Sequence, residues 1–320
     1  MEYIILVISL AGIVFGADCL VAGAVSIAKK YKVSDFVIGA AIVGVGTSMP
    51  ELVVSFIGAV NGNAEVAIGN VVGSNIFNIL GILGVTALFF PTVVSRDNMK
   101  FEMPFCILIS ILLTILVFNF FNSAIPVIGR IDGLILLAAF AFFMWYSFRR
   151  DSKNKSAENI AAREPVAEDK TPLWLAIVKV VGGLAVLITS CDFFVDNAVL
   201  IAKSFGVNDA FISLTLIACG TSLPELAASI AAALKKNTQL ALGNVIGSNI
   251  FNISLILGVS SQVMPLKSGG ITIVDYLVMI AAGILPVILG YKGKIGRVSG
   301  AFMFLCFIGY TWYLLTTQIA

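Results

Sequence analysis

Residues 46–84 read GTSMPELVVSFIGAVNGNAEVAIGNVVGSNIFNILGILG, and residues 220–258 read GTSLPELAASIAAALKKNTQLALGNVIGSNIFNISLILG. The two segments align without an insertion at an offset of 225 − 51 = 174 positions, so Glu51 of the first corresponds to Glu225 of the second. Apolar surface positions can drift among apolar residues, whereas these copies agree at their polar positions. We therefore expect each copy to supply half of one functional site.

The composition indicates that the chain lies in a lipid bilayer. Hydrophobic residues make up 59% of the 320 positions and charged residues only 12%, with a mean hydropathy of +1.03. These values exceed those of a soluble core of this size. The apolar runs are continuous rather than alternating with a period of two, which excludes a β-barrel. The sequence predicts an all-α integral membrane protein.

About ten apolar runs are long enough to cross a hydrocarbon core, which takes roughly 20 helical residues. They cover residues 3–27, 35–60, 66–90, 101–121, 126–148, 173–200, 208–233, 239–264, 271–290 and 297–317. The first run follows an acid, Glu2, and lacks a basic signal-peptide n-region, so we expect a retained first helix. The five cysteines show no CxxC spacing and there is no histidine. Neither a disulfide framework nor a thiolate or imidazole metal site is indicated, and we expect no cofactor.

Lysine and arginine gather in the odd-numbered connections between these runs, the longest of which spans residues 149–172. Positive charge is retained on the cytoplasmic side, so the bias predicts odd connections inside and both termini outside. Five helices then precede the linker and five follow it, so the second half enters the membrane from the opposite side. The sequence predicts two inverted five-helix repeats, 1–148 and 173–320, joined by a cytoplasmic linker at 149–172. Secondary transporters often have this organisation, with a site near the midplane.

The GTSxPE motif places a helix break beside an acid in each repeat. Pro50 and Pro224 have no N–H to donate, and each ring clashes with the carbonyl four residues earlier. Backbone oxygens around Gly46–Ser48 and Gly220–Ser222 should then be partly free. Irregular backbone at membrane depth is expected only where it lines a cavity or binds something. An acid in mid-membrane, here Glu51 or Glu225, typically marks an ion or proton path.

The next helix of each repeat carries a polar stripe. Its members fall at i, i+4 and i+8 and therefore share one helix face; they are Asn70, Ser74 and Asn78, and Asn244, Ser248 and Asn252. Interhelical hydrogen bonding alone could account for such a stripe, and nearby glycines suit close helix packing. The recurrence beside a carboxylate favours a binding role instead.

Two carboxylates with hydroxyl, amide and carbonyl oxygens, and without sulfur or imidazole, describe a site for a hard cation. Ca²⁺ accepts 6 to 8 oxygens in flexible geometry, whereas Mg²⁺ needs a stricter octahedron. Two glutamates would neutralise one Ca²⁺, and the same oxygens could hold Na⁺. Competition for shared ligands is a sufficient physical basis for exchange. In an alternative interpretation, each Pro-Glu pair only kinks its helix and the glutamate reaches toward a lipid headgroup or a protein partner. That arrangement would not be expected at corresponding positions of both repeats.

Paired GTSxPE motifs, each followed by GNxxGSN in inverted five-helix halves, closely resemble the α-repeats of the sodium/calcium exchangers of the cation/calcium antiporter superfamily. The resemblance covers nearly the whole chain and is strongest to the short prokaryotic members. It implies an electrogenic antiporter of the plasma membrane, working as a monomer, in which Na⁺ entry drives Ca²⁺ extrusion. It also implies that the first and sixth helices slide as a gating pair over a more static core.

The resemblance also implies roles for individual residues. Glu51 and Glu225 would be the central Ca²⁺ carboxylates, completed by the backbone carbonyls of Thr47 and Thr221. The flanking Na⁺ positions would use side chains and carbonyls from both repeats, namely Ser48, Ser74, Ser222, Ser248, Asn78, Asn252, Gly44 and Ala218.

One departure from the family pattern concerns the coupling ion. Some prokaryotic and the potassium-dependent members carry Asp where this chain has Asn252, so the Asn argues against K⁺ co-transport. An antiporter coupled to H⁺ or K⁺, or one carrying another divalent ion, remains the alternative, although proton-coupled relatives usually show GNxxE. An intramembrane enzyme is disfavoured because the GxGD and GxSG protease motifs are absent.

Overall fold

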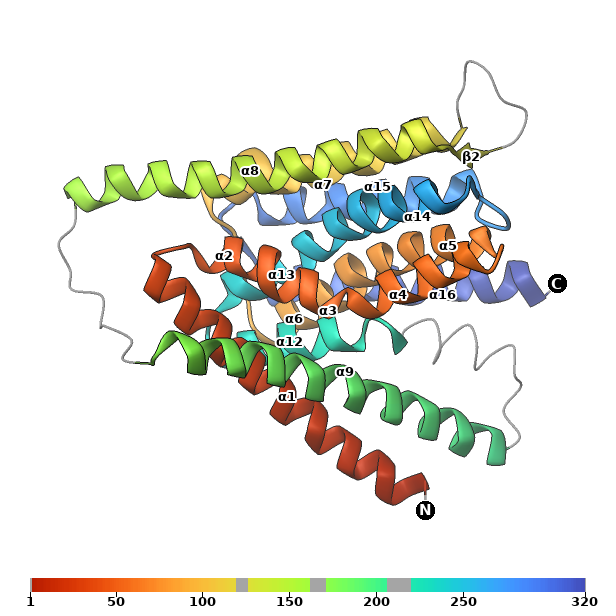
Figure 1. The fold of residues 1–320 in the computed structure, drawn as a ribbon, viewed down its shortest axis with the longest axis horizontal. Helices are drawn as coiled ribbons and strands as arrows, with labels where there is room; N and C mark the ends of the chain where they lie inside the picture. Colours follow the sequence, from red (N-terminus) through yellow and green to blue (C-terminus); the bar gives the residue numbers. More distant parts are fainter. Residues whose placement is uncertain (1, 119–125, 162–170, 206–219, 320) are drawn as a thin grey trace.

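The computed structural model describes residues 2–118, 126–161, 171–205 and 220–319, and nearly all of these are helical (Figure 1). The first half contains α1 (Glu2–Tyr31), α2 (Asp35–Ile38), the π-helix η1 (Gly39–Gly44), α3 (Val45–Thr47), α4 (Met49–Val60), α5 (Ala64–Ile76), the π-helix η2 (Phe77–Leu83), α6 (Gly84–Phe89), β1 (Thr92–Val93), the π-helix η3 (Asn98–Glu102), α7 (Met103–Phe118), β2 (Val127–Ile128) and α8 (Arg130–Ala161). The second half contains α9 (Leu173–Ser204), α12 (Leu223–Leu234), α13 (Thr238–Phe251), the π-helix η5 (Asn252–Ile256), α14 (Leu257–Val263), β3 (Leu266–Lys267), α15 (Ile273–Gly290), β4 (Lys294–Ile295) and α16 (Arg297–Ile319).

Within these described residues, eight helices are long and apolar enough to cross a membrane. The pair Asp35–Thr47 and Met49–Val60, bent by 47°, makes a ninth when it is counted as one broken span. The tenth predicted span, 208–233, falls partly outside the described residues, and its described part is α12. The prediction of an all-helical membrane protein is confirmed. The end of α8 differs clearly from expectation, because this helix continues to Ala161, well inside the predicted linker.

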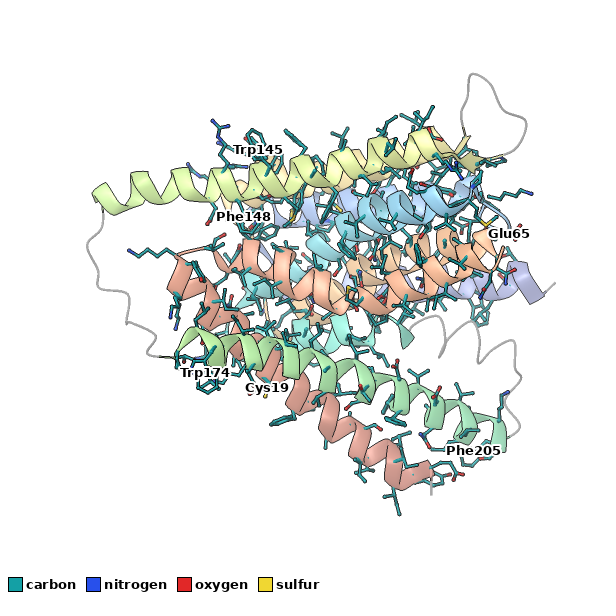
Figure 2. The ribbon with its side chains drawn as sticks, viewed as in Figure 1. Cys19, Glu65, Trp145, Phe148, Trp174 and Phe205 are labelled. Atoms are coloured by element: carbon teal, nitrogen blue, oxygen red, sulfur yellow. The ribbon has the colours of Figure 1, made fainter. Side chains whose placement is uncertain are left out.

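The surface is apolar and the interior contains acidic side chains. Large hydrophobic side chains face outward, including Ile131 at 75% and Val298 at 85% exposure, whereas Glu51 and Glu225 are both 0% exposed. Figure 2 shows Trp145 on α8 and Trp174 at the start of α9, at the periphery of the molecule. A water-soluble fold places these classes of residue the other way round, so the arrangement matches a protein whose solvent is lipid.

The first helices of the two halves run in opposite directions. The first helix of each half, α1 and α9, lie side by side and antiparallel at one edge of the molecule (Figure 1). Gly16 and Gly183 allow this close approach, because a Cβ at Gly16 would lie 2.6 Å from the backbone nitrogen of Leu187. One at Gly183 would lie 2.6 Å from the backbone nitrogen of Leu20.

Two short antiparallel ladders also connect the halves, and each ladder pairs a strand of one half with a strand of the other. β1 pairs with β4, and β3, which is β1 displaced by 266 − 92 = 174 positions, pairs with β2. Each ladder therefore joins the end of a third span of one half to the loop before the fifth span of the other. The remaining helices form a core in which α13 packs against η1 and α12 against α13. This core holds the polar residues that recur in both halves.

Candidate ion-binding site

The helix break in each repeat presents a carboxylate at the start of a short helix. α4 begins at Met49, next to Pro50, and Glu51 lies in its first turn. α12 begins at Leu223, and Glu225 lies in its first turn. The N-terminal end of a helix carries unpaired N–H groups and a partial positive charge, which stabilises an anionic side chain there.

Each buried carboxylate is held by a serine of the other repeat. Ser48 Oγ donates to Glu225 Oε1 at 2.7 Å, and Ser222 Oγ donates to Glu51 Oε1 at 2.8 Å. Ser222 Oγ also lies 3.1 Å from Ser74 Oγ. The serine of each half thus bonds the glutamate of the other, which is the pattern that a two-fold axis produces.

Asparagines of the polar stripes brace the two broken helices. Asn70 Nδ2 donates to the Glu51 carbonyl at 3.3 Å and to Ser55 Oγ at 3.1 Å. Its counterpart Asn244 makes the equivalent bonds to the Glu225 carbonyl at 3.1 Å and to Ser229 Oγ at 2.9 Å. The stripe residues nearest the break therefore fix the backbone from which each carboxylate projects.

A second network crosses between the halves through Asn75 and Asn249. Each amide nitrogen donates to the backbone carbonyl of the other residue, at 3.1 Å and 3.0 Å. Asn78 Nδ2 donates to Asn249 Oδ1 at 3.0 Å, and Asn252 Nδ2 donates to Asn75 Oδ1 at 3.1 Å. Because these bonds use the amide nitrogens of Asn78 and Asn252, the amide oxygens of both residues are left without a protein partner.

Four side-chain oxygens at these positions are buried and, among the described residues, accept no hydrogen bond. They form two equivalent pairs: Glu51 Oε2 with Glu225 Oε2, and Asn78 Oδ1 with Asn252 Oδ1. Among the ion pairs of the described residues, none neutralises either glutamate. Buried acceptors and unpaired carboxylates are costly unless a donor or a cation satisfies them. All four are oxygen ligands of the kind that hard cations prefer.

The other predicted residues lie around this centre. Thr47 is fully buried, and its Oγ1 lies 3.2 Å from Asn244 Oδ1. Thr221 Oγ1 lies 3.5 Å from Asn70 Oδ1. The Gly44 carbonyl accepts from Ser248 Oγ at 3.2 Å.

The predicted set is thus brought together from both repeats, with one exception. Ala218 lies outside the described residues, and the prediction for its carbonyl stays a prediction. The ion-ligand roles of the whole set likewise remain hypotheses, because they concern bound states.

Sequence reasoning missed four residues that orient this site, namely Asn75, Asn249, Ser55 and Ser229. A signal was available, because each pair is identical at the same offset: 249 − 75 = 174 and 229 − 55 = 174. The i, i+4, i+8 rule excluded Asn75 and Asn249 because they lie one position away from the chosen helix face.

The sequence is similar to those of known cation exchangers. The family model described as "Sodium/calcium exchanger protein" matches residues 1–149 and 175–316. The chain is 38% identical to the "Putative antiporter CaxA" of Alkalimonas amylolytica, over 98% of each protein. It is 32% identical to the "Sodium/calcium exchanger MaX1" of Methanosarcina acetivorans, over 97% of each.

The fold also matches a solved structure. A structure of the sodium-calcium exchanger NCX_Mj, from a crystal soaked with 10 mM Na⁺ and no Ca²⁺, superposes with a TM-score of 0.82 at 31% identity. The match covers 96% of both chains. It therefore includes both repeats.

Proposed function

The chain belongs to the sodium/calcium exchanger family of cation/Ca²⁺ antiporters, and we propose that it couples Na⁺ entry to Ca²⁺ extrusion through a site built around Glu51 and Glu225. The exchanged ions are substrates and not resident cofactors.

The observation that carries the proposal is the set of four unpartnered oxygens. Glu51 Oε2 and Glu225 Oε2 supply two negative charges, and Asn78 Oδ1 and Asn252 Oδ1 supply two neutral acceptors. One Ca²⁺ would be neutralised by the two carboxylates, and its demand for 6 to 8 oxygens would draw in neighbouring hydroxyl and carbonyl groups. Each sodium ion would bind to some of the same oxygens. Bound Na⁺ and bound Ca²⁺ would therefore exclude one another.

The serines give this competition a physical means. Ser48 and Ser222 each donate a hydrogen bond to a carboxylate. A cation bound at the same place needs those hydroxyls to turn and present lone pairs, which a hydroxyl rotor does easily. The network can therefore hold either ion without moving the backbone.

Access to the site would alternate by movement of α1 and α9. These helices pack on each other through Gly16 and Gly183, and, within the described residues, they contribute no hydrogen bond to the networks around the glutamates. The lysine and arginine bias of the connections supports an orientation with both termini outside, in the plasma membrane of a cell that extrudes Ca²⁺.

Transport in proteoliposomes tests the proposal. Vesicles loaded with Na⁺ should take up Ca²⁺ down the outward Na⁺ gradient, and both Glu51→Gln and Glu225→Gln should abolish this uptake. Glu65→Gln, which changes an exposed acid in the first turn of α5, is the matched control and should transport normally. Normal uptake by both central variants would show that the site is wrong.

The coupling ion is tested in the same vesicles. Uptake that follows a pH gradient and ignores Na⁺ would contradict the assignment of Na⁺, in favour of the H⁺-coupled alternative. A requirement for K⁺ on the Ca²⁺ side would favour co-transport, against the expectation from the neutral amide of Asn252.

A further inference from the structure

A polar cavity of about 300 Å³ lies away from the glutamate pair, where the start of α2 meets the end of α8 and the loop that follows β1. α8 and the gating helices α1 and α9 lie on opposite sides of the core (Figure 1). The cavity is therefore separate from the place where we expect ions to enter between α1, α9 and the core.

Three carboxylates line this cavity, Asp97, Glu102 and Asp151, together with one guanidinium, Arg150. The formal charge of this lining is −3 + 1 = −2. Arg150 is engaged by an ion pair to Asp97 and stacks 5.9 Å from the ring centroid of Phe101. Asp151 Oδ2 accepts from the backbone nitrogen of Ser34 at 3.1 Å.

Glu102 differs from the other two acids. It is 5% exposed and lines the cavity, and within the described part of the chain its Oε2 has no hydrogen-bond partner. Ser147, also 5% exposed and also lining the cavity, has an Oγ without a partner there. Two residues that line an acid-rich cavity therefore each carry a buried oxygen without a partner, and both oxygens need a donor or a cation.

The repeat does not require this acid. The residue at the matching position is Tyr276, since 102 + 174 = 276, and its hydroxyl lies 3.1 Å from Ser268 Oγ. Residues of the central site recur in both halves, whereas Glu102 occurs in one half only. Its role is thus confined to one end of the molecule, which the charge bias predicts to be cytoplasmic.

We propose that this cavity binds one hard divalent cation, with Glu102 as its central ligand and Ser147 as a neutral one. The excess of acids over bases in the lining suits a cation, and carboxylate and hydroxyl oxygens are the preferred ligands of a hard one. No three acidic or thiol side chains of the described residues converge as a ready-made metal site, so water completes the coordination. A cavity of this size leaves room for it.

The bound ion would link three elements of the fold. Glu102 ends η3 and Ser147 lies on α8, while Ser34 at the start of α2 already bonds Asp151 of α8. An ion bound between Glu102 and Ser147 would add a second contact between α8 and the neighbouring segments, in this case η3. α8 is the helix from which the linker to α9 continues.

Calorimetric titration of the purified full chain tests this site. The background is the double variant Glu51→Gln/Glu225→Gln, which removes the two central carboxylates. Titration with CaCl₂ and, separately, MgCl₂ should show one site per chain for at least one of the two ions. Adding Glu102→Gln should weaken that binding at least tenfold, whereas adding Glu65→Gln should leave it unchanged. Figure 2 labels Glu65 at the end of the molecule remote from the end of α8.

Two results would overturn the proposal: no binding of either ion in the background variant, or equal binding after Glu102→Gln. A thermal unfolding transition checks that the Glu102 variant is folded. If it is not, Ser147→Ala, which keeps every charge, takes its place. It should weaken binding severalfold, and unchanged binding would contradict the proposal in the same way.

Discussion

Replacing Asn249 by Ala should damage transport although its side chain supplies none of the four unpartnered oxygens of the central site. The amide of Asn249 makes two bonds: Nδ2 donates to the Asn75 carbonyl at 3.0 Å, and Oδ1 accepts from Asn78 Nδ2 at 3.0 Å. Both Asn249 and Asn78 are buried. The substitution therefore leaves one buried carbonyl and one buried amide N–H without their partners.

The magnitude follows from those two groups. The Asn78 N–H is left unsatisfied at about 1–3 kcal/mol, and the Asn75 carbonyl, which lies within a continuous helix, loses one bond worth about 0.5–1.5 kcal/mol. The free energy of unfolding should therefore fall by about 1.5–4.5 kcal/mol. The Asn78 amide, no longer oriented by Asn249, can then turn and change the position of its unpartnered oxygen. Loss of one well-placed ligand should weaken Ca²⁺ binding by about 1.4 kcal/mol, a tenfold rise in the Ca²⁺ concentration at half-maximal uptake.

The assay is Na⁺-driven Ca²⁺ uptake in proteoliposomes, with thermal unfolding measured on the same preparations. Asn75→Ala removes the mirror-image bonds to Asn249 and Asn252, so it should give effects of the same size. Asn61→Ala, at an exposed position after α4, should change neither property. Unaltered Ca²⁺ dependence in both buried variants would refute the orienting role of this network.

Three further outcomes are expected. Ser222→Ala should impair Ca²⁺ uptake more than Ser48→Ala, because Ser222 contacts a second serine as well as its glutamate; equal effects in uptake assays would count against this. Gly183→Ala should lower the melting temperature and slow transport, because its Cβ would meet backbone at 2.6 Å, while Gly182→Ala has nothing within 4 Å and should be neutral in both measurements. Saturating Ca²⁺ should raise the melting temperature of the parent chain by ligand linkage, because a bound ligand stabilises a single site by about 2.7 kcal/mol at 100 times Kd; this rise should become smaller in Glu51→Gln and should disappear in Glu51→Gln/Glu102→Gln.

Much of the fold was predictable because lipid imposes a simple rule on the sequence. Continuous apolar runs of about 20 residues have to be helices. The repeat at a fixed offset showed a duplication, and the odd number of helices in each copy predicted that the halves would be inverted. The end of α8 was placed too early, because hydropathy marks where the membrane ends and not where the helix ends. Residues 151–161 are polar but include helix-favouring Lys, Ala and Glu, and the helix continues through them.

The site was predictable in composition but not in its pairing. Glu51, Glu225 and the stripe asparagines were found because acidic and amide side chains are rare at membrane depth and usually mark an ion or proton path. Ser48 bonds Glu225 across 177 positions of sequence, and Ser222 bonds Glu51 across 171. These pairings depend on how the two halves pack, which the sequence pattern does not reveal. The π-helical segments η1, η2 and η5 lie next to the site and had no local signal in the sequence.

The reciprocal bonds restrict how such an antiporter can change access. Because each glutamate is held by a serine of the opposite repeat, sliding one broken helix past the other would break both serine bonds together. The polar contact of α1 with the end of α12, by contrast, is a partly exposed ion pair of Asp18 with Lys235, and exposed pairs of this kind contribute at most about 1 kcal/mol.

The α1–α9 pair and the core also share a cluster of buried apolar side chains, which includes Leu20, Leu187 and Ala228. Apolar contacts are non-directional, so one set can be exchanged for another without leaving a polar group unpaired. We therefore expect the α1–α9 pair to move against the core at a smaller cost in free energy than the broken helices, while the core keeps its four oxygens in place.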